Sequence, residues 1–202
     1  MTTNLSINVY DANGNAMDFG GEIYNRMIRI GEDEYNRETV TEIRVREVTI
    51  GIVDKAYYNC SELRSVILPD SLTEIGQWAF SWSPKLVTIN FPPTLRSIGE
   101  YAFWSCDALI ITEFPPTLTS IGKYAFLGCH SIKSLSPFPP TLTSIGCDAF
   151  AHCDYLKDIV IPDNTRVADD AFSGRGCPKL EFIAEAHGMS VNDYFRVSNL
   201  KK

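Results

Sequence analysis

Residues 63–85 read LRSVILPDSLTEIGQWAFSWSPK, and this 23-residue unit decides the fold because related copies of it recur along the chain. The pair Ala-Phe marks each copy and returns at steps of 22 to 24 residues. It stands at Ala79-Phe80, Ala102-Phe103, Ala125-Phe126, Ala149-Phe150 and Ala171-Phe172, with Ala56-Tyr57 as a variant. Self-similarity at a fixed period of this length predicts an array of stacked repeats.

Two further columns keep the register of the repeat. A β-branched residue stands four positions before each marker pair, and a glycine follows it in the four central copies. The β-branched residues are Ile52, Ile75, Ile98, Ile121, Ile145 and Val167, and the glycines are Gly76, Gly99, Gly122 and Gly146. The glycines occur singly and form neither a dinucleotide fingerprint nor a Walker sequence, so we predict that they are turn residues.

Each unit opens with alternating apolar residues that end at a proline, as in Leu63-x-x-Val66-x-Leu68-Pro69. Alternation with period two predicts a short strand with one inward face, which the proline ends by withholding a hydrogen-bond donor. In residues 100–106, Ala102, Phe103 and Cys106 share one side at helical spacing, which predicts a short helical turn. A unit this small cannot bury its own apolar face, so the copies must stack.

The repeated pattern resembles the BspA-like, or Treponema-type, class of leucine-rich repeats. Residues 63–85 match that pattern almost position by position, and the likeness extends over residues 40–183. The resemblance implies an α/β fold, a right-handed solenoid with parallel strands on its concave face and short helical turns on its convex face. It also implies a protein-interaction or adhesion module, because such proteins are often surface proteins implicated in adhesion.

The chain divides into a repeat array and two expected caps. About six or seven coils are predicted over residues 40–183. Residues 4–10 alternate like a strand before a turn signal, so residues 1–39 are predicted to form a partly β N-terminal cap. Residues 184–202 are predicted to form a C-terminal helical cap, with Ser190 as a helix N-cap. Such caps close the exposed ends of a solenoid core.

Composition restricts the partners. The 202 residues carry a net charge of -7, and 45% of them are hydrophobic, which is typical of a folded globular chain. No clustered basic surface is available for nucleic acid. The N-terminus lacks the pattern of a secretion signal, and no apolar run is long enough to span a bilayer. We expect a soluble chain, cytoplasmic or, if a signal was removed, at the cell surface or secreted.

A repeated cysteine column suggests packing rather than chemistry. It contains Cys60, Cys106, Cys129, Cys153 and Cys177, with Ser83 at the same position in one coil. Cysteine in such a column acts as a small buried hydrophobe, although neighbouring members would lie within disulfide distance if their side chains turned toward each other. Cys147 lies outside the column and is expected to be exposed.

Three histidines, His130, His152 and His187, lack metal-ligand spacing. The pair His152 and Cys153 has no recognisable third group to orient it. We therefore predict no catalytic site, no metal and no cofactor.

Binding is predicted on the face formed by the expected strands, where residues between the buried positions point outward. One outward column is Glu42, Ser65, Thr88, Ile111, Ser134 and Asp158, and the other is Arg44, Ile67, Asn90, Glu113, Ser136 and Val160. Six or seven strands at ~4.8 Å spacing would form a ribbon of about 30 Å, enough for a protein or an extended peptide.

Two other kinds of binding stay open. Glycan recognition would use aromatic residues on the opposite side of the coils, although packing between coils would also account for these residues. They are Trp78, Trp82, Tyr101, Trp104 and Tyr124. Self-association would use the open coil ends or the N-terminal strand.

Overall fold

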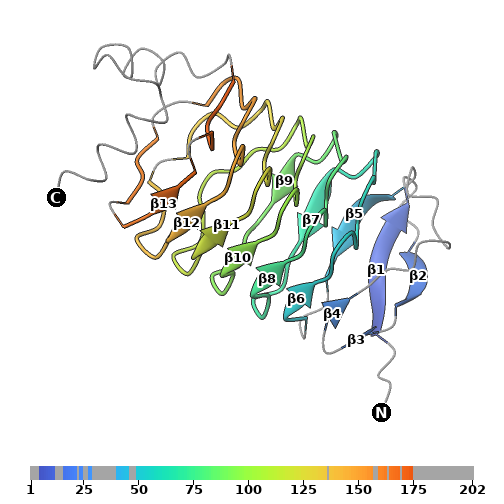
Figure 1. Cartoon of the computed structure of the whole chain (residues 1–202). Helices are drawn as coiled ribbons and strands as arrows, with labels where there is room; N and C mark the ends of the chain where they lie inside the picture. The colour runs from blue at the N-terminus through green and yellow to red at the C-terminus, as the bar shows by residue number, and fades with distance from the viewer. Residues whose placement is uncertain are drawn as a thin grey trace, which may run out of the picture.

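The structure is a computed structural model, and the residues that it describes are 5–11, 16–21, 23–24, 27–28, 40–45, 49–135, 137–156, 159–162, 164–168 and 170–174. The chain winds about one long axis, and short strands of successive coils lie side by side along it (Figure 1). Two separate ladders result, one on each side of the coils.

Ladder A contains the strands that the alternating apolar pattern predicts. In spatial order its strands are β2 (Ala16–Gly21), β1 (Leu5–Asp11), β5 (Val40–Arg44), β7 (Ser65–Ile67) and β9 (Thr88–Ile89). Strands β5, β7 and β9 run parallel, whereas β1 pairs antiparallel with both β2 and β5. The first parallel strand is therefore covered by a hairpin instead of ending in an open edge.

Ladder B follows the Ile column, where the sequence predicted only a change of direction. Its strands in spatial order are β13 (Arg166–Val167), β12 (Ser144–Ile145), β11 (Ser120–Ile121), β10 (Ser97–Ile98), β8 (Glu74–Ile75), β6 (Gly51–Ile52), β4 (Met27–Ile28) and β3 (Ile23–Tyr24). All its pairs are parallel except β3 with β4. Its six successive strands from β6 to β13 span about five turns of the solenoid.

Hydrogen-bonded turns, and no helix, connect the two ladders in the described residues. Trp78, Phe80 and Trp82 donate their backbone N–H groups to carbonyls of the next coil over 2.8–2.9 Å. Trp78 and Trp82 have φ of 59° and 60°, a left-handed conformation that an α-helix cannot contain. The helical turns predicted from the spacing of Ala102, Phe103 and Cys106 are therefore replaced by turns that bond from coil to coil.

A continuous stack of phenylalanine rings runs through the core, as the Ala-Phe column predicts. Phe80, Phe103, Phe126, Phe150 and Phe172 are at most 4% exposed. Successive rings in this series are stacked with centroids 5.2–5.3 Å apart. Each coil thus supplies one ring to a core that no single coil could enclose.

The recurrent glycines have a different role from the predicted one. Gly76, Gly99, Gly122 and Gly146 do not have the positive φ that defines a left-handed turn residue. A Cβ atom at any of them would lie 2.6–2.7 Å from a backbone atom of the preceding coil. Glycine is required at these four positions because the coils approach too closely for a side chain.

Threonine hydroxyls join the coils on their outer edge. Thr94, Thr117 and Thr141 each donate through Oγ1 to a leucine carbonyl one coil earlier, over 2.8 Å. Coils therefore carry side-chain links in addition to the backbone ladders. These links account for threonine in this column, since its hydroxyl satisfies a carbonyl that a turn would otherwise leave unpaired.

Candidate functional site

The outward side of β5, β7 and β9, here called the strand face, carries the first candidate surface. Parallel pairing aligns Glu42 with Ser65 and Ser65 with Thr88, so the predicted column exists over these three strands. Glu42 accepts hydrogen bonds from Arg44 Nε at 2.8 Å and from Ser65 Oγ at 3.4 Å. Ile67 points outward beside them and is 44% exposed.

The outward column shifts by one residue in the next coil. The prediction that Ile111 points outward is therefore wrong. Ile111 is buried, at 5% exposed, whereas its neighbour Ile110 is 50% exposed. The isolated bridge from Thr88 reaches Ile110, one residue earlier than the repeat spacing requires. Thr112 falls at the expected inward position, and a slip of one residue lets an isoleucine enter the core in its place.

The other predicted positions extend the strand face less regularly. Asn90, Glu113, Ser134 and Val160 are exposed, while Ser136 and Asp158 lie outside the described residues. In the described part of the chain, the parallel strands of ladder A end at β9, so the regular ribbon is shorter than the six or seven strands expected. Counting along the repeat did not identify Ile110 as an exposed residue. The polar Thr112 in an otherwise apolar column was the signal that could have indicated the change of register.

A second candidate surface lies on the turns that precede and follow the Ala-Phe column. We call it the aromatic surface, and its members are Tyr58, Trp78, Trp82, Tyr101, Trp104 and Tyr124. Trp78 stacks on Tyr101 with ring centroids 4.2 Å apart, and Tyr101 stacks on Tyr124 at 4.6 Å. Trp104 meets both Trp78 and Trp82 edge to face, at 5.4 and 5.3 Å. Tyr58 meets Trp78 edge to face at 6.1 Å, so the six rings form one connected cluster across four coils.

The cysteine column is a packing column in the four described members. Cys60, Cys106, Cys129 and Cys153 are buried thiols, not disulfides, and Cys177 lies outside the described residues. Cys106 donates through Sγ to the Phe80 carbonyl at 3.2 Å, and Cys129 donates to the Phe103 carbonyl at 3.1 Å. Burial raises the pKa of both thiols, which keeps them protonated and unreactive.

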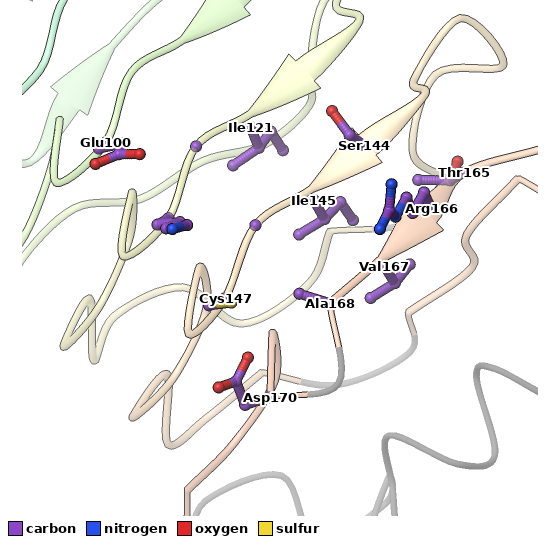
Figure 2. Close-up of a pocket in the computed structure, with 13 residues that line it drawn as sticks. Glu100, Ile121, Ser144, Ile145, Cys147, Thr165, Arg166, Val167, Ala168 and Asp170 are labelled. Carbon is purple, nitrogen blue, oxygen red and sulfur yellow. The ribbon is translucent and has the colours of Figure 1, made fainter.

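Cys147 borders an open hollow of about 990 Å³ near the last described coil. Figure 2 shows its side chain above that of Asp170, and Ile121, Ile145 and Val167 from β11, β12 and β13 line the same hollow. Cys147 is half-buried, whereas the sequence predicted an exposed side chain. Burial, and then the negative charge of Asp170, raise the pKa of the Cys147 thiol. This environment disfavours the thiolate that nucleophilic chemistry requires.

The described histidines do not assemble a reactive centre with the cysteines. His130 Nδ1 lies 3.2 Å from Asp154 Oδ2 on an exposed edge. His152 is exposed, whereas the thiol of Cys153 points inward and donates to the Phe126 carbonyl at 3.3 Å. His187 lies outside the described residues. Within the described ranges, no group of three or more His, Cys, Asp or Glu residues is placed to hold a metal ion.

No helix among the described residues has the length and hydropathy needed to cross a bilayer.

Comparisons with known proteins agree with this architecture. A family model described as the BspA type leucine rich repeat region matches residues 49–181 in six copies. No curated protein matches the chain. A Treponema pallidum leucine-rich repeat protein of known structure is 31% identical with a TM-score of 0.60, and the match covers 68% of this chain and 64% of that one.

Two structures from other bacteria have nearly the same TM-score at lower sequence identity. A leucine-rich repeat protein from Bacteroides ovatus is 26% identical with a TM-score of 0.61, over 82% of this chain and 42% of that one. A leucine-rich cell surface protein from Faecalibacterium prausnitzii is 25% identical with a TM-score of 0.61, over 86% and 46%. The chain thus spans less than two thirds of the length of each of these three relatives.

Proposed function

Because the chain belongs to the BspA-type leucine-rich repeat family, we propose that it is a non-catalytic module that binds a protein or peptide through its strand face. Proteins with these repeats are generally interaction or surface modules. Rigid stacked strands present side chains at fixed intervals, which reduces the conformational entropy lost when a partner docks.

The exposure of two isoleucines on the strand face is the observation that carries this proposal. Ile67 is 44% exposed and Ile110 is 50% exposed, whereas most other described isoleucines of the repeat array are buried in the core and Ile50, Ile159 and Ile161 are partly buried. Charged or polar neighbours, Arg44, Glu42 and Thr88, surround them on adjacent strands. Apolar anchors within a polar rim are the usual composition of a binding hot spot.

The remaining strand-face positions would contribute the rim. Asn90, Glu113, Ser134, Asp158 and Val160 complete the surface that we assign to the partner. Exposed rim charges would set association rate and specificity more than affinity. In this arrangement an extended segment that crosses the strands would contact one pair of outward side chains on each strand.

The cellular setting is also part of the proposal. The Faecalibacterium relative is described as a cell surface protein, which supports a cell-surface setting for the adhesion role that we propose. We further propose that residues 1–39 and 184–202 act as the caps of the array. The pairing of β1 with β5 supports the first of these assignments, because it covers the start of ladder A.

Affinity capture from surface fractions of the source organism, followed by a binding titration with the purified partner, tests the strand face. The variant Ile67→Arg with Ile110→Arg should lose binding by at least about tenfold, which is 1.4 kcal/mol. Tyr155→Arg is the matched control, because Tyr155 is 61% exposed and belongs to none of the strands of ladder A. Equal binding by the double variant and the wild type would refute the assignment.

A further inference from the structure

The aromatic surface is built from residues that the core does not need. The phenylalanine stack fills the interior, whereas Trp78, Tyr101, Trp104 and Tyr124 are half-buried and Trp82 is 43% exposed. The chain has three tryptophans, and all three belong to this surface. Large amphipathic rings gathered at one exposed place are typical of a binding site rather than of general solubility.

Four of the six rings stand on left-handed backbone, where bulky residues are disfavoured. Trp78, Trp82, Tyr101 and Tyr124 have φ between 55° and 60°. A bulky residue with positive φ is an outlier, although Lys55 and Asp148 have the same conformation in their coils, so the turn itself recurs along the array. The stacking of Trp78 on Tyr101 offsets part of the cost of this conformation.

In neighbouring coils, smaller residues adopt the same left-handed backbone conformation. The position of Trp82 is occupied by Asn59 one coil earlier and by Ser105 and Gly128 in the two coils that follow. Asn59, Ser105 and Gly128 also have positive φ, so the turn itself does not require tryptophan. The large ring at Trp82 is therefore accounted for by its surroundings at the surface and not by the fold.

Trp82 also offers a ring to a ligand. Its ring meets Trp104 edge to face at 5.3 Å, and among the described residues no ring stacks flat on it. The side chains one coil to either side in its column are Asn59 and Ser105, which carry hydrogen-bonding groups. A ligand that stacks on Trp82 would meet polar groups on both flanks.

The six rings alone cover less area than a stable interface with another protein. Four coils at ~4.8 Å spacing give a length of about 14 Å, and with a similar width the area is on the order of 200 Å². A stable protein interface buries about 800 Å² on each partner. The dimensions suit a short oligosaccharide.

We propose that the aromatic surface is a binding site for a neutral oligosaccharide, with Trp82 as the stacking platform. Sugar rings combine apolar C–H faces with hydroxyl groups, and the surface combines apolar ring bodies with Trp N–H and Tyr O–H tips. Acidic Glu100 and basic Lys123 directly precede Tyr101 and Tyr124 in the chain. With that balance and a net charge of -7, the surface does not favour an acidic glycan.

Intrinsic fluorescence is a specific probe, because all the tryptophans lie at the site. The wild type is titrated with cellotriose, chitotriose and maltotriose, and with sialyllactose as the acidic comparison. At least one neutral trisaccharide should change the emission saturably. Trp82→Asn should weaken that binding at least about tenfold, and its melting temperature should stay at or above that of the wild type because Asn59 occupies the equivalent backbone.

Three further variants serve as controls. They test whether a loss of sugar binding comes from this surface, from damage to the fold, or from a change on the strand face. Trp104→Leu should also weaken binding, and Leu127 occupies the same column one coil later, so leucine fits there. Ile67→Arg and Tyr155→Ala should bind the sugar as the wild type does.

The proposal is overturned by the absence of a saturable change with the neutral sugars, by preference for sialyllactose, or by undiminished binding in Trp82→Asn. A dimer that dissociates on Trp82→Asn in sedimentation velocity would also overturn it, because a second copy of the chain would then be the occupant.

Discussion

Replacing Gly122 with alanine tests whether close approach between coils is what requires glycine. A Cβ at Gly122 would lie 2.7 Å from the Glu100 nitrogen and 2.9 Å from the Gly99 oxygen. Both are backbone atoms and cannot rotate away. To reach 3.4 Å, the start of ordinary contact, the two coils must separate locally by about 0.7 Å.

That displacement stretches backbone hydrogen bonds that join the two coils just after the strands of ladder B. The Gly122 N–H donates to the Ile98 carbonyl at 2.8 Å, and the Tyr101 N–H donates to the Lys123 carbonyl at 2.9 Å. Stretching both by about 0.7 Å takes them beyond normal geometry and costs roughly 0.5–1.5 kcal/mol each. Alanine also reduces the entropy of the unfolded chain, which stabilises by about 0.4–1 kcal/mol. We expect a net loss of about 1–2 kcal/mol.

Guanidinium unfolding followed by tryptophan emission measures this loss. Gly128→Asn is the matched control, because Gly128 has φ of +74° and a Cβ there would come no closer than 3.8 Å to any neighbour. Asparagine tolerates left-handed backbone, so this variant should change the free energy of unfolding by less than about 1 kcal/mol. A Gly122→Ala variant as stable as the wild type, or more stable, would refute the reasoning from close approach.

Three more predictions concern the core. Phe103→Ala should lower the free energy of unfolding by about 3–5 kcal/mol, because it removes a fully buried ring that stacks on both sides, and Phe103→Leu by less than half of that in the same assay. Since burial raises the folded-state pKa of Cys106 and Cys129, the unfolded state loses these protons first. Urea titrations should therefore show stability constant below about pH 8 and falling above about pH 9, by up to about 1.4 kcal/mol per thiol and pH unit, and a flat profile would contradict this. Ile111→Ser should cost more than about 2 kcal/mol and Ile110→Ser less than about 1 kcal/mol, whereas the reverse order would restore the register expected from counting.

The sequence predicted the parts of the fold that side-chain chemistry determines directly. The Phe80 and Cys106 columns are buried in the described coils as the period requires, and the inward Ile75 column is buried except at Val167, which is partly buried. A position that must exclude water in every coil keeps the same residue type, so its pattern is visible without any structure. The binding partner leaves no comparable pattern, because it imposes no requirement that repeats from coil to coil.

Backbone paths were harder to predict, because several of them bury the same residues. Ala102, Phe103 and Cys106 satisfy helical spacing, yet Tyr101 and Ser105 have φ of 55° and interrupt any helix. Gly128, which stands in the column of Ser105, was the signal that could have indicated a left-handed turn there, since glycine is favoured where φ is positive. Aromatic residues at such positions concealed this signal, because they rarely adopt that conformation.

The two candidate surfaces occupy columns in which the coils differ from one another. The core column is phenylalanine in five successive coils, whereas the column of Trp82 contains asparagine, serine and glycine in neighbouring coils. Ile67 likewise aligns in the repeat with Arg44, Asn90 and Glu113. Ile67 and Trp82 are large apolar residues at exposed positions that neighbouring coils fill with polar residues or glycine, and on this contrast we assign the two columns to binding.

Because Ile67 lies on ladder A and Trp82 on the turns between the ladders, the two requirements should be separable. Side chains that share no partner contribute additively to stability, within about 0.5 kcal/mol. Combining Ile67→Arg with Trp82→Asn should therefore remove both binding activities while changing the free energy of unfolding only by the sum of the single effects. A coupling above about 1 kcal/mol, measured by a double-mutant cycle in guanidinium, would mean that both residues serve one structural role, and the case for two independent surfaces would fail.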